Sequence, residues 1–267
     1  MAGPAEILPA VAGLAGDPRN GAVMLDLDGT LAPIVARPED SAVPWRTRDL
    51  VAQIASRYGL TAVVSGRQAL EARRILGLDQ IVYVGNHGYE VLAPHAEAPV
   101  PAPALAGHER DAADFLGAYG TDALRETGVR IEDKSAIVAL HWRGAADEVA
   151  AESAAELAAA EAEAASLVVH RGRKVLELRP PVRTDKGRAI EGLLAGAAFL
   201  TAALYAGDDR TDLDAFAVLR RLQSDGRLRH AVCVGVAAPD APPEVALSAD
   251  IAVAGPDAFV TVLEALG

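Results

Sequence analysis

The sequence predicts an α/β protein built on a parallel β-sheet. Short apolar runs with few alternating polar residues recur along the chain, at 22–27, 60–64, 81–84, 200–206, 231–236 and 251–254. Such runs are typical of strands buried on both faces, as they are in a parallel sheet. Helix-like segments separate many of the runs, which is the order expected of β-α units. The middle segment, 105–182, differs in style and predicts a second unit of the α+β class.

Length, composition and charge limit the class of protein. The 267 residues allow one large domain or two smaller ones, and 51% hydrophobic residues can supply a sizeable core. A net charge of −12 argues against nucleic-acid binding and against a basic membrane patch, but a small anionic ligand needs only a local positive cluster. We see no signal-peptide pattern and no apolar run of membrane-spanning length. The single cysteine, Cys233, fits a reducing compartment. We expect a cytoplasmic protein that acts as a monomer.

The run at 22–27 ends in the stretch around which the chain is organised. Asp26 and Asp28 lie two apart on the expected strand, so both side chains point to one face at its carboxyl end. Gly29 permits a sharp turn there, at the edge where ligands of open α/β sheets bind. Crowded carboxylates repel unless a cation such as Mg²⁺ joins them, and a carboxylate can also attack phosphorus. The alternative is an ordinary Asp-Gly turn.

Polar turns also follow the next two predicted strands. Ser65 and Arg67 follow 60–64 and begin a helix, so the Ser65 hydroxyl and the backbone N–H groups could bind an anion. The alternative is a serine helix cap beside a solvated arginine. Asn86 and His87 follow the next strand and are either site groups or turn-forming residues.

The last part of the chain adds a lysine and an acidic cluster. Lys186 lies in the first turn of a predicted helix, where the helix dipole disfavours a cation, and this misfit hints at a functional lysine. The alternative is an ordinary surface lysine. Asp208, Asp209 and Asp212 then gather at the end of the strand at 200–206.

A proline-rich stretch at 94–103 predicts a domain boundary. We expect a second unit over 105–182, between 1–104 and 183–267, which the family resemblance given below identifies as a cap inserted into a core. The order of elements in this unit predicts two hairpins and a long helix whose glutamates form a solvated face. Its hairpins carry charged residues that either cover a polar ligand or simply face solvent: Glu132, Lys134, His141, Arg143, Lys174, Glu177 and Arg179.

Four of these polar segments, in this order, resemble the motifs of the haloacid dehalogenase-like phosphohydrolases: Asp26 with Asp28, Ser65–Arg67, Lys186 and Asp208–Asp212. The resemblance implies a Rossmann-like core with an inserted α+β cap of the C2B type. Within that superfamily, the chain resembles the trehalose-6-phosphate phosphatases from about residue 20 to its C-terminus. The segments that carry this likeness are 26–34, 65–67, 85–90, 207–212, 132–134, 141–143 and 177–180. Leu213 is a departure, because the family commonly has glutamate there.

The resemblance also implies site roles. Asp26 would form an aspartyl-phosphate, Asp28 would serve as acid and then base, and Ser65 and Lys186 would bind phosphate oxygens. A Mg²⁺ ion would be held by Asp26, the Asp28 carbonyl and Asp208. Supporting residues would be Thr30, Asp209 and Asp212. The expected substrate-binding residues are Arg67, Asn86, His87, Glu132, Lys134, His141, Arg143, Lys174 and Glu177.

The implied reaction is hydrolysis of trehalose 6-phosphate in trehalose biosynthesis, with a small sugar phosphate as the partner molecule. Three alternatives stay open at this point. One is a phosphatase of the sucrose-phosphate or mannosyl-phosphoglycerate type, which would share the core and differ in the cap. The others are a phosphomutase and a catalytically degenerate sugar-binding regulator.

Overall fold

The computed structural model describes residues 2–35, 37–238 and 241–267. The chain divides into two compact units, one made of Met1–Val100 with Thr184–Gly267 and the other of Pro101–Arg183. The cap expected over 105–182 lies inside the second unit. Among the described residues, none of the helices combines the length and apolar character that a membrane crossing requires.

The first unit contains an eight-stranded sheet with the strand order β12-β11-β10-β1-β2-β3-β4-β5. Its strands are β1 (Gly21–Leu25), β2 (Leu60–Val64), β3 (Val82–Gly85), β4 (Glu90–Leu92), β5 (Val100–Pro101), β10 (Ala202–Gly207), β11 (His230–Val236) and β12 (Ile251–Val253). The strands from β12 to β3 are parallel, and β4 pairs antiparallel with β3. The predicted α/β class with a parallel sheet is confirmed.

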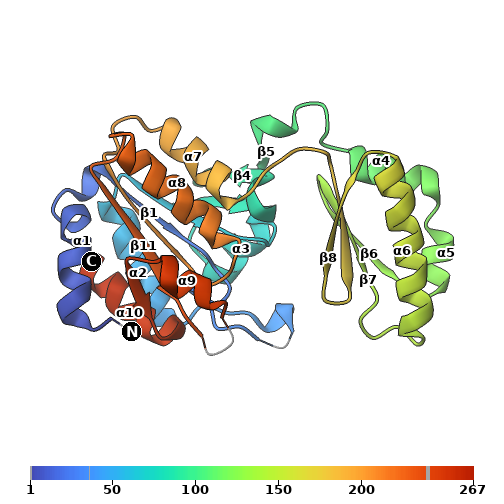
Figure 1. Ribbon diagram of the computed structural model, residues 1–267, viewed down its shortest axis with the longest axis horizontal. Coiled ribbons are helices and arrows are strands. Elements are labelled where there is room, and N and C mark those ends of the chain that lie inside the picture. Colours follow the sequence, from blue (N-terminus) through green and yellow to red (C-terminus); the bar gives the residue numbers. More distant parts are fainter. Residues whose placement is uncertain (1, 36, 239–240) are drawn as a thin grey trace. The chain divides into compact units, whose positions relative to one another are not determined.

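Helices cover both faces of this sheet (Figure 1). They are α1 (Pro4–Ala15), α2 (Trp45–Arg57), α3 (Ala69–Leu76), α7 (Lys186–Ala195), α8 (Asp212–Ser224), α9 (Pro243–Ser248) and α10 (Gly255–Leu266). Short 3₁₀ turns lie at Pro18–Asn20, Pro38–Asp40, Asn86–Gly88 and Pro103–Leu105. Helix α9 was not predicted from the sequence.

The central strand β1 shows why its residues must be apolar throughout. Val23 and Leu25 pack with α1, α2, α3 and α10, whereas Met24 packs on the opposite face with α7, α8 and α9. All five β1 residues are buried, as expected of a strand covered on both sides. Cys233 is likewise buried, in β11, and packs as a small hydrophobic residue.

The strand order changes direction at β1, and this creates the place for a ligand. From β1 the chain proceeds through β2 to β3 on one side, and from β10 through β11 to β12 on the other. Connections that leave in opposite directions open a crevice at the carboxyl ends of β1 and β10. The polar turns that follow β1, β2 and β10 therefore meet at one edge of the sheet.

The second unit is a four-stranded antiparallel sheet covered by helices on one face. Its elements are α4 (Asp111–Tyr119), α5 (Asp122–Glu126), β6 (Arg130–Lys134), β7 (Ile137–His141), α6 (Glu148–Ala164), β8 (Val168–Gly172) and β9 (Val175–Arg179). The sheet order is β6-β7-β9-β8, so the two hairpins share one sheet. The short helix α5 was not predicted.

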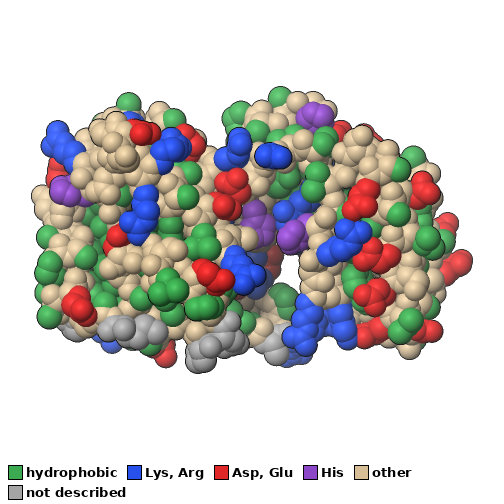
Figure 2. All heavy atoms as spheres, in the orientation of Figure 1, with side chains coloured by type: hydrophobic (Ala, Val, Ile, Leu, Met, Phe, Trp, Pro, Cys, Tyr) green, Lys and Arg blue, Asp and Glu red, His purple; other side chains and the backbone are tan. Residues whose placement is uncertain are grey.

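Helix α6 buries alanines and exposes glutamates, as its composition predicts. Ala151, Ala155, Ala158, Ala159 and Ala162 are fully buried. The glutamates at 152, 161 and 163 are exposed, and acidic side chains gather over this helix in Figure 2. The opposite face of the sheet carries the charged residues described below.

Candidate active site

A pocket of about 720 Å³ lies at the carboxyl ends of the strands of the first unit. Its polar wall consists of Asp26, Asp28, Ser65, Arg67, His87, Lys186, Asp208, Asp209 and Thr211. The glycines at 29 and 66 and the apolar residues Pro33, Ile34, Ala238, Ala241, Pro242 and Pro256 complete the lining. Eight expected site residues thus meet in one pocket, although they come from widely separated parts of the chain.

Lys186 joins two carboxylates at the base of the pocket. Its Nζ donates to Asp26 Oδ1 at 2.6 Å and to Asp212 Oδ1 at 2.7 Å. The lysine side chain is only 3% exposed, so its charge is compensated by these two partners and not by water. Burial lowers the pKa of Lys186, but Asp212 and Asp26 outweigh it and raise that pKa above its ordinary value. Lys186 therefore presents a fixed positive charge beside Asp26.

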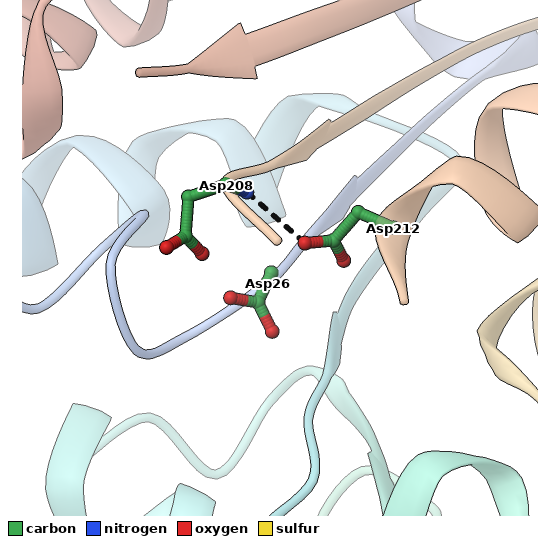
Figure 3. A group of neighbouring side chains, drawn as sticks. All are labelled: Asp26, Asp208 and Asp212. Atoms are coloured by element: carbon green, nitrogen blue, oxygen red, sulfur yellow. Dashed lines mark hydrogen bonds between the residues drawn. The ribbon is translucent and has the colours of Figure 1, made fainter. Parts of the chain in front are cut away.

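Asp212 is the anchor of this network. Its Oδ1 also accepts a hydrogen bond from the Tyr205 hydroxyl at 2.7 Å, and its Oδ2 accepts the backbone N–H groups of Asp208 and Asp209 at 3.0 and 2.9 Å. Figure 3 shows the carboxylates of Asp26, Asp208 and Asp212 turned toward one another. Each Asp212 oxygen already accepts two hydrogen bonds, which suits a supporting residue better than a direct metal ligand.

Gly29 makes room for Asp208. Its backbone has φ of +87°, and a Cβ built there would lie 2.0 Å from Asp208 Oδ2. Any other residue would collide with the carboxylate and strain the turn. Asp208 Oδ1 is buried, and the described structure gives it no hydrogen-bond partner. A buried oxygen without a donor points to a ligand that the protein itself does not supply.

The acidic cluster carries excess negative charge. Oxygens of Asp26, Asp208 and Asp212 lie within 4.8 Å of one another. Burial, with smaller contributions from Asp212 and Asp208, raises the pKa of Asp26 well above its ordinary value, although Lys186 opposes the rise. Burial and the Asp212 charge raise the pKa of Asp208 to about 7. A divalent cation would offset this repulsion, so the donor set fits a hard, oxygen-binding ion.

Asp28 has partners different from those of Asp26. Its carboxylate binds the Arg67 guanidinium through two hydrogen bonds, of 2.6 Å to Nε and 3.0 Å to Nη2. Ser41 Oγ donates to the same carboxylate at 2.9 Å. The Asp28 side chain is thus held by Arg67 and Ser41 and is not one of the three carboxylates of the acidic cluster. Thr30, which follows it, is fully buried, and its hydroxyl has no hydrogen-bond partner within the described residues.

Hydrogen bonds from the loop after β3 hold the loop after β2 in place. Ser65 is buried, and its hydroxyl accepts the backbone N–H of Arg67 at 3.1 Å. The N–H groups of Asn86 and His87 donate to the carbonyls of Arg67 and Ser65. Asn86 and His87 have φ of 51° and 55°, a left-handed conformation that non-glycine residues adopt rarely. His87 lines the pocket, whereas Asn86 is buried and is not part of the pocket wall.

The second unit presents a polar face on its sheet. Val138, Leu140, Leu176 and Leu178 lie on one face of the sheet and pack in the core of this unit with its helices. On the other face, Lys134 Nζ donates to Glu177 at 3.1 Å, and His141 lies 2.7 Å from Glu132. Burial would raise the pKa of Glu177, but Arg179 and Lys134 lower it to about 2. The Glu132 pKa is lowered mainly by its hydrogen bond with His141.

Two expected cap residues do not join this cluster. Lys174 lies in the turn between β8 and β9, with φ of 62°, and pairs with Glu148 at the start of α6. Arg143 lies beyond the end of β7, and its guanidinium donates to the Arg173 carbonyl at 3.3 Å. The structure therefore groups Glu132, Lys134, His141 and Glu177 and separates them from the other two.

Comparison with known proteins decides the family. A family model described as trehalose-phosphatase matches residues 24–250. The chain belongs to the trehalose-phosphatase family. Probable trehalose-phosphate phosphatase 4 of Oryza sativa subsp. japonica is 34% identical over 210 residues, which cover 74% of this chain and 55% of the rice protein. The chain spans about half the length of the curated trehalose-phosphate phosphatases it matches.

Solved structures agree with this assignment. One described as a trehalose-6-phosphate phosphatase related protein has a TM-score of 0.67 at 26% identity and covers 91% of this chain and 95% of that chain. A haloacid dehalogenase-like hydrolase from Bacteroides thetaiotaomicron shares the fold, with a TM-score of 0.61 at 15% identity over 91% of this chain and 98% of that chain. The family predicted from the motifs is confirmed, and the haloacid dehalogenase-like hydrolase shows the same fold.

Several contacts of the site in this trehalose-phosphatase family member were not predicted. Ser41 reaches Asp28 from a proline-containing loop, and Tyr205 reaches Asp212 from inside an apolar strand. Arg179 was expected only among the charged residues of the hairpins and not in the substrate-binding set, and it binds Glu177 on the polar face of the sheet. Residues 238, 241 and 242, which form part of the pocket wall, follow β11. Their position after a core strand could have predicted that they line the site.

Proposed function

We propose that this trehalose-phosphatase family member hydrolyses trehalose 6-phosphate to trehalose and inorganic phosphate. The observation that carries the proposal is the arrangement around Asp26. This carboxylate stands at the carboxyl end of β1, is bound by Lys186 at 2.6 Å, and shares a cluster with Asp208. That arrangement joins a nucleophile, a fixed cation and further oxygen ligands, which are the components that phosphoryl transfer needs.

The chemistry follows from which side chain holds which partner. Lys186 binds Asp26 Oδ1, so we assign the attack on phosphorus to Oδ2. The new Asp26 O–P bond forms as the P–O bond to the sugar breaks, and the sugar oxygen takes a proton from Asp28. Asp28 then takes a proton from water, which attacks phosphorus and breaks the bond to Asp26. Phosphate leaves and Asp26 is restored.

We propose that Mg²⁺ occupies the acidic cluster, held by Asp26, Asp208 and the backbone carbonyl of Asp28. Support comes from the buried Asp208 oxygen that lacks a hydrogen-bond partner among the described residues, and from the mutual repulsion of the three carboxylates. Asp209 and Asp212 keep the roles of supporting residues. When bound, the cation would neutralise phosphate charge and hold the phosphoryl group in line with Asp26.

Phosphate binding falls to Ser65 and Lys186 in this proposal. Ser65 lies buried at the start of a tight turn that the N–H group of Arg67 closes, and both residues line the pocket. His87 adds a polar group to the same wall. The fixed geometry of these groups means that little reorganisation accompanies charge development on the phosphoryl oxygens.

Sugar recognition falls to the polar face of the cap sheet. Glu132, Lys134 and Glu177 are partly buried and form ion pairs, so they are held in defined orientations. Carboxylates and ammonium groups are good partners for the hydroxyls of a disaccharide, and a site built for hydroxyls rejects ligands that lack them. The single cysteine supports a reducing compartment, and we propose a cytoplasmic location.

Phosphate release from a panel of disaccharide and monosaccharide phosphates tests the proposal. We expect the highest kcat/KM with trehalose 6-phosphate, no turnover in the presence of a chelator, and recovery on addition of Mg²⁺. Higher kcat/KM with sucrose 6-phosphate or mannosyl-3-phosphoglycerate would redirect the substrate assignment and leave the core chemistry intact. Undiminished turnover in chelator would refute the metal assignment.

Asp26→Asn tests the nucleophile in the same assay. The amide is not nucleophilic, so the variant should lose turnover on every substrate of the panel while its fold is kept. Near-normal hydrolysis by this variant would exclude the aspartyl-phosphate mechanism.

A further inference from the structure

The acid and base residue of the proposed reaction, Asp28, is held from two sides by groups outside its own loop. Arg67 comes from the turn between β2 and α3, and its Nη1 also binds Glu71 on α3 at 2.5 Å. Ser41 comes from the loop that precedes α2 and is 8% exposed. Its backbone N–H donates to the Pro38 carbonyl at 3.2 Å, which fixes the serine at the end of a 3₁₀ turn.

The two oxygens of Asp28 are engaged unequally. Oδ1 accepts from Ser41 Oγ at 2.9 Å and from Arg67 Nη2 at 3.0 Å, whereas Oδ2 accepts from Arg67 Nε at 2.6 Å. A carboxylate oxygen offers about two acceptor positions. Both positions of Oδ1 are therefore occupied, and one position of Oδ2 is left over. A proton can be transferred to or from Asp28 most readily at Oδ2, because fewer hydrogen bonds occupy that oxygen.

We propose that Ser41 and Arg67 are positioning residues that fix the Asp28 carboxylate and direct its proton transfers to Oδ2. The inference deepens the proposed phosphatase function and rests on it. Arg67 aligns the carboxylate plane through a bidentate contact, which a planar guanidinium provides and an ammonium group does not. Ser41 donates a hydrogen bond that occupies the second acceptor position of Oδ1. Without the serine hydroxyl, the carboxylate can rotate or bind water at Oδ1.

The test uses leaving groups of different basicity. Protonation by Asp28 matters most when the departing oxygen is a poor leaving group, as it is in a sugar phosphate, and least when a nitrophenolate departs. We would measure kcat/KM of Ser41→Ala and of wild type for a series of aryl phosphates and for trehalose 6-phosphate, at saturating Mg²⁺. This parameter covers the steps up to loss of the leaving group.

The positioning role predicts a loss that grows along the series. We expect Ser41→Ala to lose about tenfold in kcat/KM with phenyl phosphate and the sugar phosphate, and about twofold or less with a dinitrophenyl phosphate. Ser41→Thr keeps a hydroxyl and should restore the wild-type dependence on the leaving group. Ser56→Ala is the matched control, because its hydroxyl donates to the Gln53 carbonyl on an exposed part of α2.

Other outcomes overturn the inference. An equal loss across the series would mean that Ser41 acts through general disruption of the site, and no loss would mean that the hydrogen bond is irrelevant. The aryl series separates this inference from the substrate assignment. If the wild-type protein does not hydrolyse trehalose 6-phosphate but hydrolyses aryl phosphates through Asp26, the substrate assignment is refuted. The aryl series still tests the role of Ser41 in that case. An Asp26→Asn variant that stays active on aryl phosphates would refute the underlying mechanism.

Discussion

Replacement of Asp212 by asparagine should destabilise the first unit severely. The fully buried carboxylate accepts hydrogen bonds from four donors: Lys186, Tyr205 and the backbone N–H groups of Asp208 and Asp209. An amide has one acceptor oxygen, and its NH₂ group would face donors that include an ammonium or backbone N–H groups, which cannot accept. The change also leaves the buried lysine with one carboxylate partner. We expect the free energy of unfolding to fall by about 3–5 kcal/mol.

The single cysteine supplies an assay for this loss. Cys233 is buried in β11 of the same unit, and burial, with a further effect of Asp250, raises the pKa of its thiol to about 12. Modification by a thiol reagent along a urea gradient therefore reports opening of this unit. Asp225→Asn is the matched control, because that exposed acid lies just beyond α8 and should change stability by less than about 0.5 kcal/mol. Equal urea midpoints for Asp212→Asn and the control would refute the anchoring role.

Three further predictions follow from the geometry. Glu177→Gln removes a carboxylate with a pKa of about 2, so the variant should be less stable than wild type by about 3 kcal/mol at most at pH 7. This stability difference should shrink as the pH falls from about 4.5 toward 2, because the wild-type carboxylate becomes protonated. Urea midpoints measured across this pH range test it, and a pH-independent difference would contradict it. Gly29→Ala should lower kcat for aryl phosphates by about a hundredfold or more, because the new methyl would meet Asp208 at 2.0 Å; Gly107→Ala, at a similar φ but in open space, should keep full activity. Glu132→Ala should lower kcat/KM for trehalose 6-phosphate about a hundredfold and barely affect an aryl phosphate; equal losses on both would indicate a folding defect.

The edge of the sheet that carries the site was predictable because apolar runs and the polar turns that end them are local signals. Each apolar run ends where its polar turn begins, so Asp26, Ser65 and Asp208 could be assigned to one edge before any contact was known. The family resemblance then supplied roles that the local patterns left open. The hairpins of the cap were also predictable, because turn residues separate short runs.

The remaining contacts depend on register and on loop paths, which a single sequence does not encode locally. Ser41 lies 13 positions from Asp28 in a loop without periodicity. Tyr205 looks like one more core residue in an apolar run, although its hydroxyl binds Asp212. Lys174 was grouped with the sugar-binding residues, but its place in a left-handed turn directs it to Glu148. Each outcome was decided by the pairing of distant segments.

Identification of the residue that carries the phosphoryl group tests the central claim most directly. The enzyme would be mixed with substrate and Mg²⁺, quenched in acid, reduced with borohydride, and digested for mass spectrometry. Reduction converts an aspartyl-phosphate to homoserine, so we predict homoserine at position 26 in the wild type and none in Asp26→Asn. Homoserine at position 28 or 208, or steady phosphate release without any modified aspartate, would contradict the account.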